Sequence, residues 1–233
     1  VAIYRCFISL SNWNGNTTAN TNINAAVRGS VLMASKDLVT AGHIMMVPCY
    51  ADGADSASVT VDGWTTGASN YIKIYTPVAT TEVGATQRHN GTWGNGYRRT
   101  AALTLSDEYV RVDGLSIYQT AADRIYFVSG SAGVGEVHIS NCFGWYTNAS
   151  ATGFDVFDVW TVGTMTVKFW NCIGINDSTS ASSEAFYPND SSATVYIYNC
   201  TGIANAGRAF YTWQGTSHIK NSIGYSASSS AFL

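Results

Sequence analysis

Apolar and polar residues alternate in five segments of the chain that superpose without gaps. These segments are VRVDGLSI (110–117), VHISNCFG (137–144), VKFWNCIG (167–174), VYIYNCTG (195–202) and SHIKNSIG (217–224). A period of two indicates a strand with one buried face. VTVDGW (59–64) fits the same frame. The pattern predicts a stack of similar strands, each burying its first and third positions.

The fifth position of each segment predicts a turn. It reads Gly114, Asn141, Asn171, Asn199 and Asn221, at steps of 22 to 30 residues, and Gly63 is an earlier member of the same column. Asn and Gly tolerate left-handed backbone conformations, and such steps suit one coil of a solenoid. We expect the asparagines to stack along the axis at the inter-strand spacing of ~4.8 Å.

The next position holds Cys142, Cys172, Cys200 and then Ser222. A metal or redox cluster is one interpretation of this column. The other is a ladder of buried, reduced thiols, because free cysteine is among the most buried residue types. Parallel Cβ vectors on stacked strands give poor disulfide geometry, so the packing interpretation is preferred.

A second repeat precedes each new coil. It reads IYFVSG (125–130), GFDVFD (153–158), AFYPND (185–190), AFYTWQ (209–214) and AFL (231–233). This alignment predicts an internal aromatic stack of Tyr126, Phe154, Phe186, Phe210 and Phe232. We expect an all-β parallel solenoid over residues 55–233. An open last coil would leave an edge on which further segments or other chains could stack.

Residues 1–54 are less periodic and are expected to form an N-terminal cap. The residues expected to provide its apolar cover are Trp13, Leu32, Met45 and Met46. Cys6 and Cys49 fall in the same segment and could approach each other there.

Taken together, the two repeats and their Ser- and Gly-rich turns resemble the right-handed parallel β-helices of the pectin-lyase-like superfamily. That superfamily includes polysaccharide lyases, glycoside hydrolases, phage tailspikes and adhesins. VTVDGWTTGASNYIKIYTP (59–77) and RHNGTWGNGYR (88–98) resemble uncharacterised β-helix proteins of environmental bacteria and phages. The resemblance implies a β-helix fold and an extracellular or virion-surface location, and it transfers no catalytic residue.

Composition narrows the classes of partner. The net charge is −3, with 12% charged residues and no basic run, which argues against nucleic acid as a partner. No apolar stretch approaches the ~20 residues of a membrane span. No CxxC pair points to zinc, and no cofactor motif is present. Thr40–His43 resembles the histidine motif of trypsin-like proteases, but no Gly-Asp-Ser-Gly-Gly loop follows, so His43 is taken as an ordinary residue.

Two carboxylates are the candidate catalytic residues. Asp158 and Asp190 share a column in the second repeat, followed by Gln214. Stacked strands would place the carboxylates about 5 Å apart, which suits retaining glycoside hydrolysis and would equally suit calcium. The alternative is a polar turn in which aspartate caps backbone amides.

Outward positions of the first repeat form the candidate binding surface. One column holds Arg111, His138, Lys168, Tyr196 and His218, and its neighbour holds Asp113, Ser140, Trp170, Tyr198 and Lys220. Trp170, Tyr198, Lys168, His138 and Lys220 are the predicted ligand-binding residues. Aromatic faces stack on sugar rings, and cations bind carboxylates or sulfates. A polysaccharide lyase would use a basic residue beside an acidic calcium cluster, but this face offers only Asp113. A solvated strand face is the structural alternative.

Two functions follow. The first is a β-helix module of a secreted or virion-associated protein, carbohydrate-facing or structural and without a catalytic motif. The second is a carbohydrate-active enzyme, a polysaccharide lyase or glycoside hydrolase. A polysaccharide or other glycan is the expected partner in either case.

Overall fold

The computed structural model describes residues 5–17, 19–83, 86–130, 133–149, 152–160 and 162–233. Its strands form three series of parallel neighbours, which we call ladders A, B and C. Ladder A consists of β1 (Met45–Pro48), β4 (Ile72–Tyr75), β7 (Val110–Asp113), β10 (Glu136–Ser140), β13 (Thr166–Trp170), the end of β15 (Phe186–Tyr198) and β17 (Gln214–Lys220).

Ladder B consists of β2 (Ala54–Asp55), β5 (Arg98–Arg99), β8 (Ser116–Gln119), β11 (Phe143–Tyr146), β14 (Ile173–Asn176), β16 (Thr201–Ala204) and β18 (Ile223–Ser226). Ladder C consists of β3 (Val59–Val61), β6 (Leu103–Leu105), β9 (Tyr126–Ser129), β12 (Phe157–Trp160) and the start of β15. The long strand β15 therefore joins ladders A and C into one eleven-stranded sheet.

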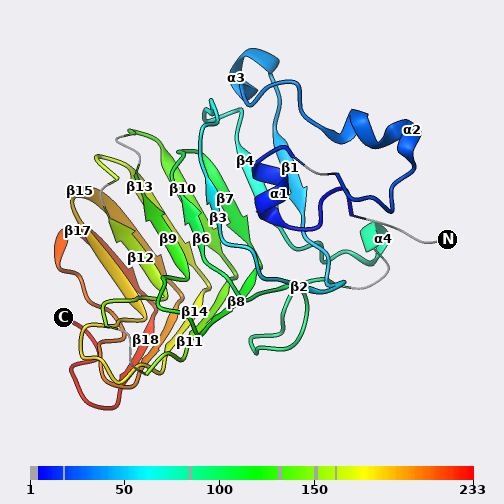
Figure 1. Cartoon of the computed structure of the whole chain (residues 1–233). Coiled ribbons are helices and arrows are strands. Elements are labelled where there is room, and N and C mark those ends of the chain that lie inside the picture. The colour runs from blue at the N-terminus through cyan, green and yellow to red at the C-terminus, as the bar shows by residue number, and fades with distance from the viewer. Residues whose placement is uncertain (1–4, 18, 84–85, 131–132, 150–151, 161) are drawn as a thin grey trace.

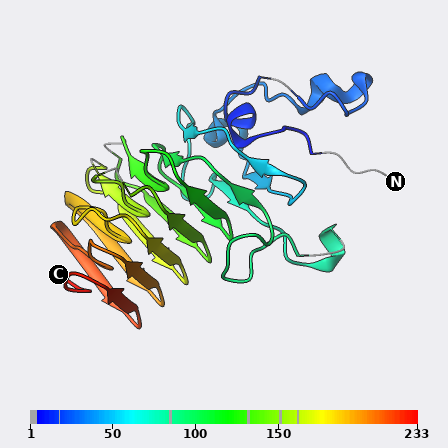
Figure 2. The ribbon, with the colours of Figure 1, turned by 60° about the horizontal axis from the view of Figure 1, so that its bottom comes forward.

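The chain visits the ladders in turn, and neighbouring strands within each ladder pair in parallel. The strands therefore recur as successive coils, which Figure 2 shows as a row of arrows running from green to red towards the C-terminus. Figure 1 shows the curled sheets at one end and the N-terminal segment at the other. The predicted all-β, parallel-stranded architecture is confirmed, and it is consistent with a solenoid.

Helices are short and few in the described part of the chain. They are α1 (Leu10–Asn14), α2 (Ala25–Arg28), the 3₁₀ helix η1 (Gly29–Val31), α3 (Leu38–Ala41) and α4 (Thr80–Val83). None of them has the length and apolar character that crossing a membrane requires.

The asparagine column turns each coil from ladder A to ladder B, as predicted. Asn141, Asn171, Asn199 and Asn221 have φ between 50° and 55°, in the left-handed region. The Asn171 side-chain amide donates to Oδ1 of Asn141 over 3.3 Å. One assignment was wrong: Val59–Val61 belongs to ladder C, so Gly63 lies outside this column. Ile72–Tyr75 pairs with Val110–Asp113 instead, because it offers the same alternation of buried and outward side chains.

The cysteine column is buried and reduced. Cys142, Cys172 and Cys200 are each at most 1% exposed and form no disulfide. The Cys172 thiol donates to the Trp170 and Ile139 carbonyls over 3.3 and 3.4 Å. Ser222 continues the pattern with hydroxyl bonds to the Lys220 and Ile197 carbonyls. The buried, inward position that the packing interpretation predicted for the column is confirmed.

We expect these thiols to be unreactive in the folded protein, because all three side chains are buried and a labelling reagent cannot reach them. Burial also raises the pKa of the Cys172 thiol well above its usual range, and the thiolate is the reactive form. The hydrogen bond with Cys172 lowers the pKa of the Cys200 thiol, so the protection of Cys200 depends on its burial. Thiol titration should label exposed Cys6 at once and the column cysteines only in denaturant. Rapid labelling of all three column cysteines in native buffer would contradict the packing account.

An internal aromatic stack runs along ladder C, but one member differs from the prediction. The rings of Tyr126, Phe157, Phe186, Phe210 and Phe232 follow one another with centroids 4.6 to 4.9 Å apart. Phe157, and not Phe154, pairs with Tyr126 and Phe186. The sequence alignment of 153–158 was therefore three residues out of register.

Glycines of ladder B make room for this stack. A Cβ on Gly174 would lie 3.2 Å from ring atoms of Phe157 and Phe186, and one on Gly202 would lie 3.0 Å from the Phe210 ring. The glycine that follows each cysteine by two positions is therefore the packing partner of the rings.

The N-terminal segment packs against one end of the ladders. Trp13 is buried and stacks on Trp64 with a centroid distance of 5.3 Å. Met45 is partly buried against the core. Leu32 and Met46, however, are 39% and 46% exposed, so their predicted role as apolar cover was wrong. Strand β1 already pairs with β4, so the parallel pairing includes residues before the predicted start at 55.

Candidate functional site

The two predicted outward columns lie side by side on the outer face of ladder A, and each begins one coil earlier than expected. We call this surface the cation–aromatic stripe. Its first column is Lys73, Arg111, His138, Lys168, Tyr196 and His218, and its second is Tyr75, Asp113, Ser140, Trp170, Tyr198 and Lys220. The predicted residues His138, Lys168, Trp170, Tyr198 and Lys220 are therefore brought together on one face.

Rings and cations of the stripe contact one another. Lys168 and His138 both approach the Trp170 ring, with Nζ and the imidazole centroid 5.8 and 5.5 Å from it. The Lys220 ammonium lies 5.7 Å from the Tyr198 ring. Tyr196 stacks on His218 at 4.8 Å. The surface is thus a flat layer of rings beside positive charge.

Acids on the stripe are paired. Glu136 contacts Lys168 over 2.7 Å and His138 over 3.0 Å, and Asp113 contacts Arg88 over 2.7 Å. Burial lowers the pKa of His138, so its ring is neutral at pH 7. Lys73, Arg111 and Lys220 lie over tyrosine rings and have no carboxylate partner among the salt bridges of the described residues. The face therefore offers positive charge on a chain whose net charge is −3.

Asp158 and Asp190 do not share a column, so the predicted carboxylate ladder was wrong. Asp158 pairs in register with Phe127 and Tyr187. Asp190 lies beyond this stretch and accepts the backbone N–H groups of Val162, Ser192 and Ala193 over 2.7 to 3.1 Å. Asp190 therefore caps backbone amides, as the alternative interpretation expected, but it does so at an irregularity within strand β15 and not in a turn. The expected neighbour Gln214 pairs with Asn189.

A different set of charged residues occurs on successive coils. The residue two positions before each stacked ring is Arg124, Asp155, Glu184 or Arg208. Backbone bonds from Ile125 to Asp155, from Val156 to Glu184 and from Ala185 to Arg208 place these four residues in one row. They line a hollow of about 590 Å³ together with Trp160 and Trp213. We call this hollow the carboxylate groove.

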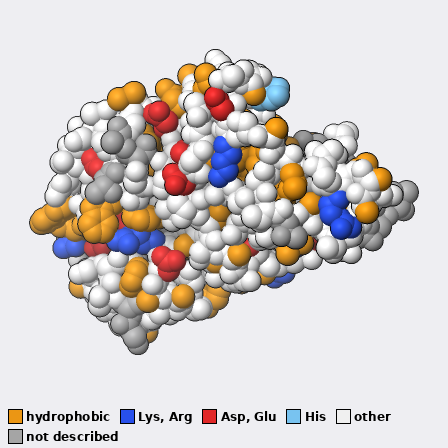
Figure 3. All heavy atoms as spheres, turned by 45° about the horizontal axis from the view of Figure 1, so that its top comes forward, with side chains coloured by type: hydrophobic (Ala, Val, Ile, Leu, Met, Phe, Trp, Pro, Cys, Tyr) orange, Lys and Arg blue, Asp and Glu red, His pale blue; other side chains and the backbone are white. Residues whose placement is uncertain are grey.

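Two aromatic side chains rise at the rim of the carboxylate groove. Trp160 and Trp213 are 43% and 58% exposed. Tyr187 and Tyr211 also line the groove and stack on each other at 5.3 Å. Figure 3 shows hydrophobic side chains beside basic and acidic ones at the left of the molecule, over the coils nearest the C-terminus. A concave site lined by rings and a few polar groups is typical of ligand pockets.

The acids at the floor of the groove are almost fully buried. Asp155 and Glu184 are 1% and 2% exposed. Oδ1 of Asp155 accepts the Glu184 backbone N–H over 2.6 Å, and Arg208 donates to Oε1 of Glu184 over 3.3 Å. Burial, with the charges of Asp158 and Glu184, raises the pKa of Asp155 well above its usual range. The raised pKa favours the protonated form of the Asp155 carboxyl, which hydrogen-bonds the Glu184 side chain. Burial raises the pKa of Glu184 as well.

Asp158, whose charge acts on Asp155, forms an ion pair with Arg124. Burial raises the pKa of Asp158 to about 6. Its Oδ1 is buried with no hydrogen-bond partner. The Arg124 guanidinium lies 4.5 Å from the Phe127 ring and 5.1 Å from the Trp160 ring.

Sequence reasoning missed Glu184, Arg124 and Arg208, although a signal was present. Aligning the buried pairs Ile125–Tyr126, Val156–Phe157, Ala185–Phe186 and Ala209–Phe210 places a charged residue before each pair. The alignment was instead fixed on Phe154, which shifted Asp155 away from Glu184.

The chain matches no protein-family model, no curated protein and no solved structure. The candidate sites therefore depend on their own geometry.

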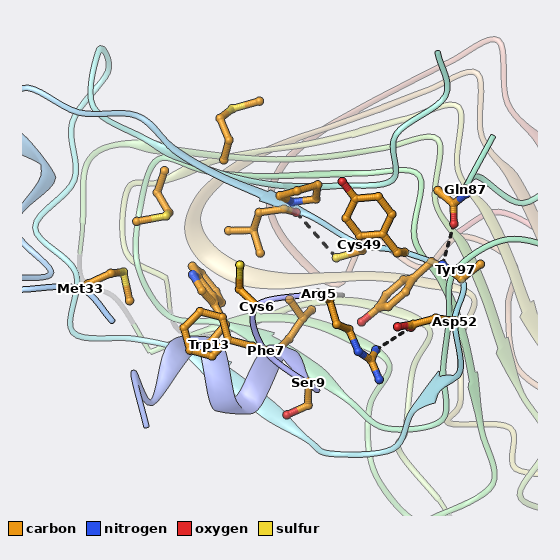
Figure 4. A pocket seen from close by; sticks show the side chains of 17 residues that line it. Arg5, Cys6, Phe7, Ser9, Trp13, Met33, Cys49, Asp52, Gln87 and Tyr97 are labelled. Atoms are coloured by element: carbon orange, nitrogen blue, oxygen red, sulfur yellow. Dashed lines mark hydrogen bonds and ion pairs between the residues drawn. The ribbon is translucent and has the colours of Figure 1, made fainter. Parts of the chain in front are cut away.

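A cavity of about 660 Å³ lies under the N-terminal segment (Figure 4). Arg5 and Asp52 form an ion pair of 3.0 Å at this cavity. Cys6 and Cys49 both line it as free thiols, and Cys49 is buried. Within the described residues, no group of three or more His, Cys, Asp or Glu is placed to hold a metal ion. His43 is exposed and belongs to neither surface.

Proposed function

We propose that the chain is a right-handed parallel β-helix of the pectin-lyase-like kind, serving as the polysaccharide-binding module of a secreted or virion-surface protein. The order of ladders A, B and C along the chain supports the β-helix, because every coil adds one strand or bridge to each ladder. The asparagine turns and the inward stack support one continuous core.

The cation–aromatic stripe is the observation that carries the binding function. Rings on a flat sheet present π-faces to sugar rings, and Lys and Arg beside them bind carboxylate or sulfate groups. Trp170 is 36% exposed on this surface. Since the columns repeat once per coil, a polymer lying along the axis meets the same chemistry repeatedly. The preferred ligand is therefore an acidic polysaccharide.

Replacing both Trp170 and Tyr198 by alanine should remove polysaccharide binding and leave the thermal midpoint within a few degrees of the wild-type value. The two rings lie on the outer face, where substitutions change stability little, but they supply the stacking surface. Binding would be measured on an array of neutral and acidic glycans, followed by titration calorimetry with each glycan that binds.

Tyr225→Ala is the matched control, because Tyr225 is an outward ring that is 60% exposed on ladder B. It should keep full binding. Unfolding of the double variant would show that the stripe rings are structural. Unchanged binding by a folded double variant would remove the stripe as the binding surface.

We also propose a partner for the edge strands. Strands β17 and β18 form one edge of ladders A and B, and Ile223 in β18 is 69% exposed. A further β-segment, from the same protein or another chain, would pair with this edge and cover its apolar side chains.

A further inference from the structure

The cavity under the N-terminal segment belongs to neither the cation–aromatic stripe nor the carboxylate groove. Its volume of about 660 Å³ is within the usual range of small-molecule pockets. Residues before and within helix α1 line it, and so does strand β1, the first strand of ladder A. The N-terminal segment therefore leaves a space between itself and the first coil.

Most of the side chains around this space are apolar. Trp13 lines the cavity and is buried, whereas Met46 lines it and is still 46% exposed, so the cavity reaches the surface. Met33 and Met45 also line it, and flexible methionine side chains adapt to ligands of different shape. Water in an apolar cavity finds few hydrogen-bond partners. An apolar ligand would therefore be more stable than water in this space.

The charged groups of the cavity are gathered at one side. Figure 4 shows Arg5, Asp52 and Gln87 there, and Trp13 and Met33 towards the other side. The Arg5 guanidinium contacts the Asp52 carboxylate over 3.0 Å, and their side chains are 23% and 50% exposed. An exposed ion pair contributes little stability, so an acidic ligand can replace Asp52 on Arg5 at little cost.

We propose that this cavity binds a single-chain amphiphile with a carboxylate head, the chemical class of the fatty acids. The head contacts Arg5, because a guanidinium binds a carboxylate through two parallel hydrogen bonds. The tail lies against Trp13 and Met33. A cationic head would take Asp52 and leave Arg5, the less exposed of the two charges, without a partner, which is unfavourable. The site is independent of polysaccharide binding by the stripe.

Isothermal titration calorimetry of the purified chain with octanoate, decanoate and dodecanoate, each below its micelle concentration, tests the proposal. One molecule should bind per chain. The affinity should rise about tenfold for every two added methylene groups, because each buried methylene adds a similar hydrophobic contribution. Acetate, which has the head without the tail, should show no binding. 1-Decanol and decylammonium should both bind more weakly than decanoate, and decylammonium should bind least.

Two substitutions at the charged side should change the affinity in opposite directions. Arg5→Gln should lower the affinity for decanoate about tenfold, because it removes a charged hydrogen-bond donor, and should leave the affinity for 1-decanol unchanged. Asp52→Asn should raise the affinity for decanoate about two- to fivefold, because it removes the carboxylate that competes for Arg5. A purely structural role of the ion pair would not produce opposite effects.

A substitution at the apolar side tests where the tail lies. Met33→Trp fills this part of the cavity and should abolish the binding of decanoate and of 1-decanol. Leu32→Trp is the matched control, because Leu32 is the neighbouring residue, is 39% exposed and lies outside the cavity lining. It should keep the wild-type affinity. Circular dichroism would first show that each variant is folded.

The Cys6 thiol gives a second measurement that needs no variant. Cys6 lines the cavity and is exposed, so bound decanoate should slow its alkylation by iodoacetamide at the concentrations at which calorimetry shows binding. Absence of binding by every carboxylate would overturn the proposal, and an apolar polypeptide segment would become the expected occupant. Preference for decylammonium, or an unchanged decanoate affinity in a folded Arg5→Gln or Met33→Trp protein, would also overturn it.

Discussion

Replacing Phe186 by alanine should lower the free energy of unfolding by about 3–5 kcal/mol, the usual range for a buried phenylalanine. The Phe186 side chain is fully buried and stacks on Phe157 and Phe210 at 4.6 and 4.9 Å. It also meets the edge of Phe169 from ladder A at 5.9 Å. The cavity left by the ring would be lined by these rigid neighbours, which limits relaxation. Urea unfolding followed by tryptophan fluorescence would measure the loss.

Tyr225→Ala removes a ring of similar size from the outer face of ladder B and should change stability by less than about 0.5 kcal/mol. A Phe186→Ala protein as stable as this control would mean that the aromatic stack is not part of the core. Phe154→Ala offers a second comparison. Phe154 lies outside the stack and contacts Tyr146 at 6.3 Å, so its loss should be smaller than that of Phe186.

Asp55→Ala should destabilise the protein by about 3–5 kcal/mol, because it leaves a buried arginine without its counter-charge. Arg99 and Asp55 form an ion pair whose side chains are 0% and 1% exposed. Oδ2 of Asp55 also accepts the Tyr97 hydroxyl over 3.0 Å and the Leu10 backbone N–H over 2.9 Å. One carboxylate therefore connects the N-terminal helix α1 to ladder B. Thermal and urea unfolding would measure the effect.

The double variant Asp55→Leu/Arg99→Met should be more stable than Asp55→Ala alone, because a buried ion pair replaced by apolar side chains costs little. Asp52→Ala breaks the more exposed pair with Arg5 and should change stability by no more than about 1 kcal/mol. Equal losses for Asp55→Ala and Asp52→Ala would show that the Arg99 charge is not isolated from water.

The repeat could be predicted wherever its positions are chemically distinctive. Asn at a left-handed turn followed by Cys in a tight corner is hard to misalign, and the structure places Asn141, Asn171 and Asn199 in register. Val59–Val61 was misplaced because Asp-Gly after a strand marks a turn without saying which one. Ladder C and ladder A both need a buried Val-x-Val, so the alternation alone cannot separate them.

The aromatic column shows a second limit. Phe154 and Phe157 are both hydrophobic, and either gives a plausible stack when the loop before them varies in length. The structure selects Phe157 because Gly144 and Gly174 leave space opposite the ring positions. With Phe157 in the stack, Asp155 and Glu184 occupy equivalent positions on adjacent coils. Asp158 and Asp190, which were expected to share a column, do not. The residues of the stripe were predicted more fully, because they lie on strands of the well-aligned repeat. The residues of the groove follow loops whose lengths differ between coils, so their register could not be read from the sequence.

The identical pairing of each coil with the one before and the one after has an evolutionary consequence. Val195–Tyr198 meets Val167–Trp170 on one side and Ser217–Lys220 on the other through the same backbone contacts. Duplication of a coil-length segment would therefore add one coil without disturbing the coils already present, and deletion of such a segment would remove one coil. The length of ladder A, and with it that of the cation–aromatic stripe, is a trait that selection can adjust in single genetic steps, while an ordinary globular core would have to be rebuilt.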